Sequence, residues 1–330
     1  MKMHRFLITG GAGFIGSHVA KKILKKFGNS KVVIFDNYAR YQDPLKFDEF
    51  NYLKLRFSNI KNKVTFERGD AKNSFIVYDI LKKHKPNYII HLAAVPLART
   101  SNLNVGEMKN GSVDTTSCLI ENLNKLKKEK EIKINKFLYI SSSMVYGDFK
   151  NKSVKENDET NPKDLYGIMK LAGENITIGL CQLFNIPFSI IRPSAVYGPT
   201  DINHRVSQIF LEKAIKKEKI VLYGKDEMLD FTYVDDIAEG IIIVAMSKKS
   251  NGETFNITFG KARLLMDYIN ILKSYFPDLN YQIKPRNNLI PKRGTLSIQK
   301  ASDLHNFKPL YNLEKGIQKY VETTITHFEK

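Results

Sequence analysis

The chain has 330 residues, of which 42% are hydrophobic, which is enough for one large α/β domain and a smaller lobe. No apolar run reaches the roughly 18 residues that a membrane-spanning helix needs, so we expect no membrane partner. The first strand is expected to begin near Arg5, which leaves no room for a signal peptide and favours a cytoplasmic protein.

The formal net charge of +18 is typical of nucleic-acid-binding proteins. The lysines, however, fall in pairs on the expected outer faces of helices, such as Lys21-Lys22 and Lys216-Lys217, without interleaved aromatic residues. No nucleic-acid-binding motif accompanies them, and frequent Lys, Asn and Ile are typical of an AT-rich genome. We therefore expect no nucleic-acid partner, although the charge favours anionic substrates.

The first expected strand, 5–9, ends at a glycine cluster that precedes a helix-like pattern over 14–27. The glycines Gly10, Gly13 and Gly16 have the spacing G-x-x-G-x-x-G. Between a strand and a helix, such glycines permit a tight turn, close approach of the backbone to a pyrophosphate and close packing of the helix. The N-terminus of the helix then offers free N–H groups to phosphate.

The second expected strand, 31–35, ends on Asp36, whose carboxylate can accept hydrogen bonds from the adenosine ribose. The two features together predict a dinucleotide site, and the alternative is an ordinary tight turn between a strand and a helix. Asp36 would repel a 2′-phosphate, and Asn37 and Tyr38 offer no compensating cation. The expected cofactor is therefore NAD, and we expect no metal site.

Strands alternate with helices through the first 200 residues, which predicts a doubly wound parallel Rossmann sheet. Further strands are expected at 64–67, 88–92, 136–141 and 187–192, and helices at 74–84, 105–127 and 166–185. After Pro199 the alternation is less regular, with helices expected near 204–217, 236–247, 264–275 and 313–328 and strands near 220–223, 231–234, 254–258 and 280–284. We predict an NAD-binding domain over 1–198 and an α/β substrate-binding lobe over 199–330, part of which packs back on the sheet.

Tyr166 and Lys170 are four residues apart on an expected helix and therefore share a face. An ammonium beside a phenol stabilises the phenolate and lowers its pKa from about 10, so Tyr166 can exchange a proton with a sugar hydroxyl near neutral pH. The serine run 141–143 follows the fifth expected strand, at the edge of the sheet where ligands bind. A hydroxyl there can hold the reacting oxygen beside Tyr166.

These motifs resemble the extended short-chain dehydrogenase/reductase family, and within it the nucleotide-sugar epimerases and dehydratases such as UDP-glucose 4-epimerase. The resemblance extends over essentially the whole chain and rests on 9–16, 36–37, 69–71, 91–94, 141–147, 166–174, 192–199 and 230–236.

The resemblance implies that Ser142, Tyr166 and Lys170 are catalytic, with Tyr166 as the acid/base and Lys170 holding the nicotinamide ribose. Besides Tyr166 and Lys170, it implies cofactor contacts from Gly10, Gly13, Phe14, Ile15, Gly16, Asp36, Asn37, Asp70, Ala71, Leu92, Ala93, Ala94 and Pro193. It also implies substrate contacts from Pro96, Ser143 and Met144.

Two departures from the family pattern bear on the reaction. The 4,6-dehydratases carry Asp-Glu after the catalytic Thr, and decarboxylases carry a Glu, whereas this chain has Ser143 and Met144. The family's usual diphosphate-binding Arg is replaced by Leu229, and Arg205 and Arg293 are the candidate replacements.

We therefore expect an NAD-dependent nucleotide-sugar 4-epimerase that acts through a transient 4-keto intermediate in surface-polysaccharide or glycan precursor synthesis. Its substrate would be a nucleotide-diphosphate sugar. The alternatives are a 4,6-dehydratase or reductase of the same family, and a non-catalytic NAD-sensing or RNA-binding protein on the same fold.

The resemblance also implies a homodimer, because family members commonly pair the helices equivalent to 105–127 and 166–185. Six apolar positions suit such an interface unless they face the core of their own chain: Leu119, Ile120, Leu123, Ile176, Leu180 and Leu183.

Overall fold

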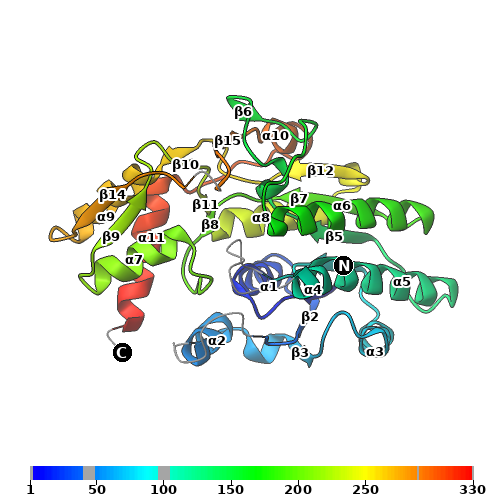
Figure 1. Ribbon diagram of the computed structural model, residues 1–330. Helices are drawn as coiled ribbons and strands as arrows, with labels where there is room; N and C mark the ends of the chain where they lie inside the picture. The colour runs from blue at the N-terminus through cyan, green and yellow to red at the C-terminus, as the bar shows by residue number, and fades with distance from the viewer. Residues whose placement is uncertain (1–2, 40–48, 96–104, 288–289, 329–330) are drawn as a thin grey trace.

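The computed structural model describes residues 3–39, 49–95, 105–287 and 290–328, which Figure 1 shows as a ribbon. Seven strands form one sheet in the order β12-β7-β5-β4-β1-β2-β3, and all neighbouring strands are parallel. They are β1 (Arg5–Thr9), β2 (Lys31–Asp36), β3 (Thr65–Arg68), β4 (Tyr88–His91), β5 (Lys136–Ile140), β7 (Phe188–Arg192) and β12 (Glu253–Asn256). The predicted doubly wound parallel sheet is therefore confirmed.

Helices cover both faces of this sheet. In β1, Phe6 and Ile8 belong to one hydrophobic cluster and Leu7 to the other, because alternate residues of a strand point to opposite sides. One layer contains α1 (Phe14–Lys26) and α8 (Val234–Met246), and the other contains α3 (Ser74–His84), α5 (Thr115–Lys128) and α6 (Leu165–Leu183). Burial of both faces explains why the strands read as continuous apolar runs in the sequence.

The expected helix 105–127 is a continuous helical stretch with a π-turn inside it. It consists of α4 (Val105–Lys109), the π-turn Asn110–Asp114 and α5. Leu119, Ile120 and Leu123 are fully buried in the hydrophobic cluster of their own chain. Their expected place in a dimer interface is therefore wrong, because a helix on a buried sheet must turn its apolar stripe inward.

The carboxy-terminal half contributes to both parts of the molecule. Figure 1 shows α7 (Val206–Ile215), α9 (Leu265–Tyr275), α11 (Leu313–Phe328) and the paired strands β9 (Ile220–Tyr223) and β14 (Tyr281–Lys284) gathered at one end of the sheet. The part of the chain between β9 and α9 returns to the sheet, because its helix α8 packs beside α1 and its strand β12 pairs with β7. The division at residues 198–199 stays a prediction.

Several short elements connect these parts. They are α2 (Glu49–Phe57), β6 (Ser153–Val154), β8 (Val196–Tyr197), β10 (Met228–Leu229), β11 (Thr232–Tyr233), β13 (Arg263–Leu264), β15 (Thr295–Leu296) and α10 (Gln299–His305). Within the part of the chain described here, no helix is both long enough and apolar enough to cross a membrane.

Candidate active site

The turn between β1 and α1 brings the backbone close to two neighbouring segments. Gly10 has a φ of +65°, and a Cβ at this residue would lie 2.7 Å from the Ala93 nitrogen, so only glycine fits. A Cβ at Gly16 would lie 2.7 Å from the Cα of Gly11, so the helix packs directly against the turn. Gly13 is the N-cap of α1 and supplies no side-chain cap, which leaves N–H groups of the first turn available to phosphate oxygens.

Asp36 ends β2 beside this turn. Its Oδ2 accepts a hydrogen bond from the Ala12 N–H (3.0 Å), and its Oδ1 accepts one from the Tyr38 N–H (2.9 Å). Burial raises the pKa of the Asp36 carboxyl, and these donors and the nearby Arg56 guanidinium lower it in part. Arg56, which the sequence analysis missed, donates to the carbonyl oxygens of Ala12 (3.0 Å) and Thr200 (2.5 Å) and so ties the turn to the segment after β8.

The other predicted cofactor residues lie at the start of α1 and just after β2, β3, β4 and β7, where a parallel sheet binds its ligands. They are Phe14, Ile15, Asn37, Asp70, Ala71, Leu92, Ala93, Ala94 and Pro193. In the same region His91 contacts Thr9 Oγ1 (2.6 Å) and Thr116 Oγ1 (3.0 Å), and burial lowers the pKa of His91 to about 3. A neutral imidazole that joins β1, β4 and α5 has a structural role.

Ser142 follows β5 and is the N-cap of a 3₁₀ turn, Ser143–Tyr146. Its Oγ accepts a hydrogen bond from the Met144 N–H at 3.1 Å. The Ser143 N–H donates to the Pro193 carbonyl oxygen at 2.9 Å. The serine turn is thereby held against the segment that follows β7.

Tyr166 and Lys170 lie on one face of α6, as predicted. The Asp164 side chain caps this helix by accepting from the Gly167 N–H at 2.6 Å, which places Tyr166 in the first turn. The Lys170 side chain is buried, and its Nζ donates to the Ile140 carbonyl oxygen at 2.8 Å and lies 5.9 Å from the centroid of the Tyr166 ring. Lys170 therefore lies between the Tyr166 ring and the end of β5.

The expected lowering of the Tyr166 pKa is wrong for the protein alone. Burial raises the pKa of Tyr166, and this effect exceeds the lowering by Arg205, by a hydrogen bond with Ser142 and by Arg293. Burial likewise lowers the pKa of Lys170 to about 8. The spacing along the helix predicts that Tyr166 and Lys170 are neighbours, but it does not predict how deeply both side chains are buried.

Arg293 and Arg205 reach the same segment, residues 194–196, from different parts of the chain. Arg293 Nη2 donates to the hydroxyls of Ser194 (3.1 Å) and Ser143, and its Nη1 contacts the Met144 sulfur. Its Nε is buried and has no hydrogen-bond partner among the described residues. Burial lowers the pKa of Arg293 to about 10. Arg205 Nη1 donates to the Val196 carbonyl oxygen at 3.2 Å.

Two positions singled out in the sequence remain separate from this group. Pro96 lies outside the described residues. Leu229 is partly buried in β10, where it pairs with Arg263 of β13. Arg263 forms ion pairs with Asp267 (2.9 Å) and Glu314 (2.8 Å), so its guanidinium is already neutralised.

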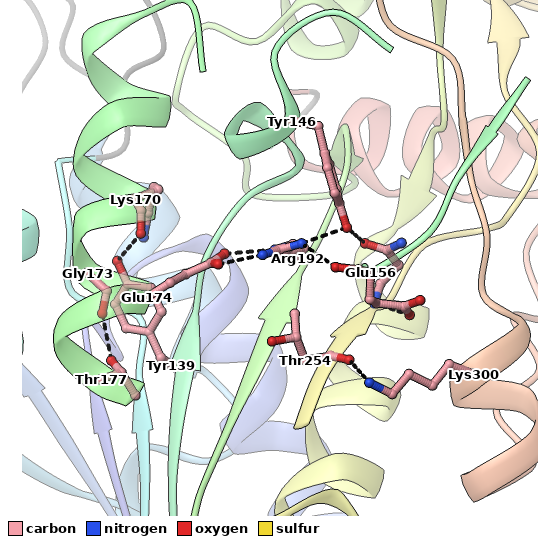
Figure 2. Close-up of polar contacts among 11 residues, drawn as sticks. Tyr139, Tyr146, Glu156, Lys170, Gly173, Glu174, Thr177, Arg192, Thr254 and Lys300 are labelled. Atoms are coloured by element: carbon pink, nitrogen blue, oxygen red, sulfur yellow. Dashed lines mark hydrogen bonds and ion pairs between the residues drawn. The ribbon is translucent and has the colours of Figure 1, made fainter. Parts of the chain in front are cut away.

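The sequence analysis also missed a buried ion pair one helical turn beyond Lys170 on α6, which Figure 2 shows. Both carboxylate oxygens of Glu174 accept hydrogen bonds from Arg192, at 2.9 Å from Nε and 2.7 Å from Nη2. The available signal was the spacing of Glu174, which continues the series of Tyr166 and Lys170 at four-residue intervals along the helix.

Residues 6–258 match the sequence model of the NAD dependent epimerase/dehydratase family. The chain belongs to this family. It is therefore an enzyme of a family that acts on nucleotide sugars, and NAD is its cofactor. The residues present fit NAD, because Gly13 begins α1 without a side-chain cap and leaves N–H groups for phosphate, and Asp36 ends β2 beside this turn.

Relatives of both reaction types are similar to the chain. A dTDP-D-glucose 4,6-dehydratase of Dictyostelium discoideum is 28% identical over 77% of the chain, which spans only 58% of that relative. An uncharacterized UDP-glucose epimerase of Bacillus subtilis (strain 168) is 28% identical over 95% of both chains. The UDP-glucuronic acid 4-epimerase of Bacillus cereus, solved with UDP-glucuronic acid and NAD, is 26% identical, with a TM-score of 0.87 over 98% of this chain and 99% of that one.

Proposed function

We propose that this protein is a nucleotide-sugar 4-epimerase that works through a transient 4-keto sugar. Two observations carry the proposal together. Ser142, Tyr166 and Lys170 form one group, and the two residues that follow Ser142 are Ser143 and Met144 instead of two carboxylates. Loss of water from a sugar needs a second acid and base beside the reacting carbons. The nearby carboxylate of Asp164 is engaged as the cap of α6, which leaves epimerisation as the better-supported reaction.

Each catalytic residue has a distinct task in this proposal. Tyr166 accepts the proton of the C4 hydroxyl and later returns it, while Ser142 holds the same oxygen through its hydroxyl. Lys170 stabilises the Tyr166 phenolate through its positive charge and binds the nicotinamide ribose. Bound NAD supplies the hydride chemistry, taking up a hydride from the sugar and giving it back.

Arg205 and Arg293 are the proposed partners of the substrate diphosphate. Two negative charges in a partly dry site need cations, and a guanidinium can grip phosphate oxygens in a bidentate way. Both side chains reach the segment that follows Pro193, and the buried Nε of Arg293 still has a hydrogen to donate. Leu229 offers no charge at the usual position.

The experiment that tests the proposal is a screen of UDP-, GDP-, CDP- and dTDP-sugars with NAD, in which nuclear magnetic resonance identifies the product. The proposal predicts interconversion of one sugar and its C4 epimer, and none with Tyr166→Phe. Formation of a 4-keto-6-deoxy sugar in the screen would instead support the dehydratase that the relatives also include.

A further inference from the structure

A buried polar cluster lies between the catalytic helix and the carboxy-terminal part of the chain, and Figure 2 shows it. The Arg192 guanidinium, which pairs with Glu174, also donates through Nη1 to the hydroxyl of Tyr146 (2.9 Å) and to the Glu156 carbonyl oxygen (3.0 Å). The Tyr146 hydroxyl in turn donates to Asn256 Oδ1 at 2.8 Å. Glu174 and Arg192 are only 2% and 6% exposed, so water does not screen their charges.

This cluster touches each segment that carries a catalytic group. Glu174 lies on α6 four residues after Lys170, Tyr146 ends the 3₁₀ turn that Ser142 caps, and Arg192 precedes Pro193. Asn256 extends the cluster to the residue after β15, because its Nδ2 donates to the Ser297 carbonyl oxygen at 3.3 Å.

The cluster also supplies a negative charge that acts on Lys170, because Glu174 lies four residues further along the same helix. Burial lowers the pKa of Lys170, the charge of Glu174 raises it, and Arg205 lowers it further. The titratable groups that face Lys170 come from four elements: Tyr166 and Glu174 from α6, Tyr139 from β5, His91 from β4 and Arg205 before α7. In this set the Glu174 carboxylate is the anion that opposes loss of the Lys170 proton.

We propose that Glu174 and Arg192 are positioning residues for the reaction: Glu174 keeps Lys170 an ammonium in its dry site, and Arg192 fixes the Glu174 carboxylate where it can do so. A buried pair is weak evidence for stability, because neutral residues of similar volume often replace such pairs without loss. A role in holding a charge on Lys170 gives the pair a function that neutral residues would not fulfil. The inference rests on the proposed role of Lys170 in binding the nicotinamide ribose.

The test measures the affinity for NADH between pH 6 and pH 10 through the fluorescence of the reduced nicotinamide. In the wild type, affinity should fall as the pH rises through about 8, where Lys170 loses its proton. Glu174→Gln removes the opposing charge and should move this fall down by about one pH unit, which corresponds to about 1.4 kcal/mol. This readout needs no sugar substrate, so failure of the proposed epimerase reaction would not affect it.

Two control variants separate charge from packing. Tyr146→Phe removes two hydrogen bonds from the same cluster, the one from Arg192 and the one to Asn256, but no charge, and should leave the fall at its wild-type pH. Lys170→Met should bind NADH more weakly and without the fall, and a fall that persists in it would contradict the role of Lys170 and this inference together. Should Glu174→Gln not fold, Glu174→Gln with Arg192→Met leaves no unpaired guanidinium. It should still show a downward shift, smaller than that of Glu174→Gln because a positive charge is removed as well. Weaker binding by a constant factor at every pH in the Glu174 variants would overturn the proposal.

Discussion

At the residue scale, Arg293 is the most informative side chain of the site. The hydrogen bonds of its guanidinium to described residues go to the neutral groups Ser143, Met144 and Ser194. The carboxylates of Asp164 and Asp230 act on it only through their charge. Burial correspondingly lowers its pKa to about 10. A buried cation held by hydroxyls is a costly arrangement unless an anion completes it.

The substrate anion should therefore depend on this side chain. We expect Arg293→Ala and Arg205→Ala each to raise the KM for the nucleotide sugar roughly 10- to 100-fold, as loss of a hydrogen bond to a charged group implies. Lys292→Ala removes an exposed positive charge one residue away and serves as the control, with little change in KM. Steady-state kinetics with an identified substrate measures the effect. Unchanged KM in both arginine variants would rule out the proposed diphosphate contacts.

At the scale of elements, the position of α6 depends on how closely it approaches β5. A Cβ at Gly173 would lie 2.1 Å from the Tyr139 hydroxyl oxygen, which itself donates to the Lys170 carbonyl oxygen at 3.3 Å. The helix can therefore bring Tyr166 and Lys170 to the end of β5 only with glycine at this position.

Two glycines of α6 provide a matched comparison. Gly173→Ala should destabilise the protein by about 1–3 kcal/mol, because the added methyl group forces the helix away from Tyr139. Gly179→Ala lies on the same helix with nothing within 4 Å and should stabilise the protein by about 0.5–1 kcal/mol through higher helix propensity. Urea unfolding measures both changes. Equal effects of the two substitutions would show that close packing at Gly173 does not position α6.

The longer elements could be predicted from the sequence because they carry a clear signal. The strands of the sheet are apolar runs, and α1 and α6 follow a glycine turn and a capping Asp. Strands of two residues, such as β8 and β15, are too short to show any periodicity and are defined by their tertiary pairing. The catalytic face of α6 could be predicted because its residues are one helical turn apart. The pair of Glu174 and Arg192 joins residues 18 positions apart on different elements, so only the folded structure reveals it.

At the scale of the whole molecule, α6 leaves apolar side chains uncovered at both of its ends. Ile168 is 45% exposed and Leu183 is 70% exposed. We expect this face to pair with a second copy of the chain, so that light scattering at micromolar concentration gives twice the chain mass of 37.9 kDa. Leu183→Asp should shift the equilibrium toward the monomer, and a wild-type monomer would contradict the expected dimer.

The central claim is that the reaction inverts one carbon and removes no water. The measurement that tests it most directly is turnover of an identified nucleotide sugar in D₂O, followed by nuclear magnetic resonance of the product. In an epimerase, Tyr166 exchanges only the hydroxyl proton, so the account predicts the C4 epimer with no deuterium bound to carbon. Loss of water across C5 and C6 requires removal and replacement of the C5 proton, so a 4-keto-6-deoxy sugar with deuterium at C5 would contradict the account.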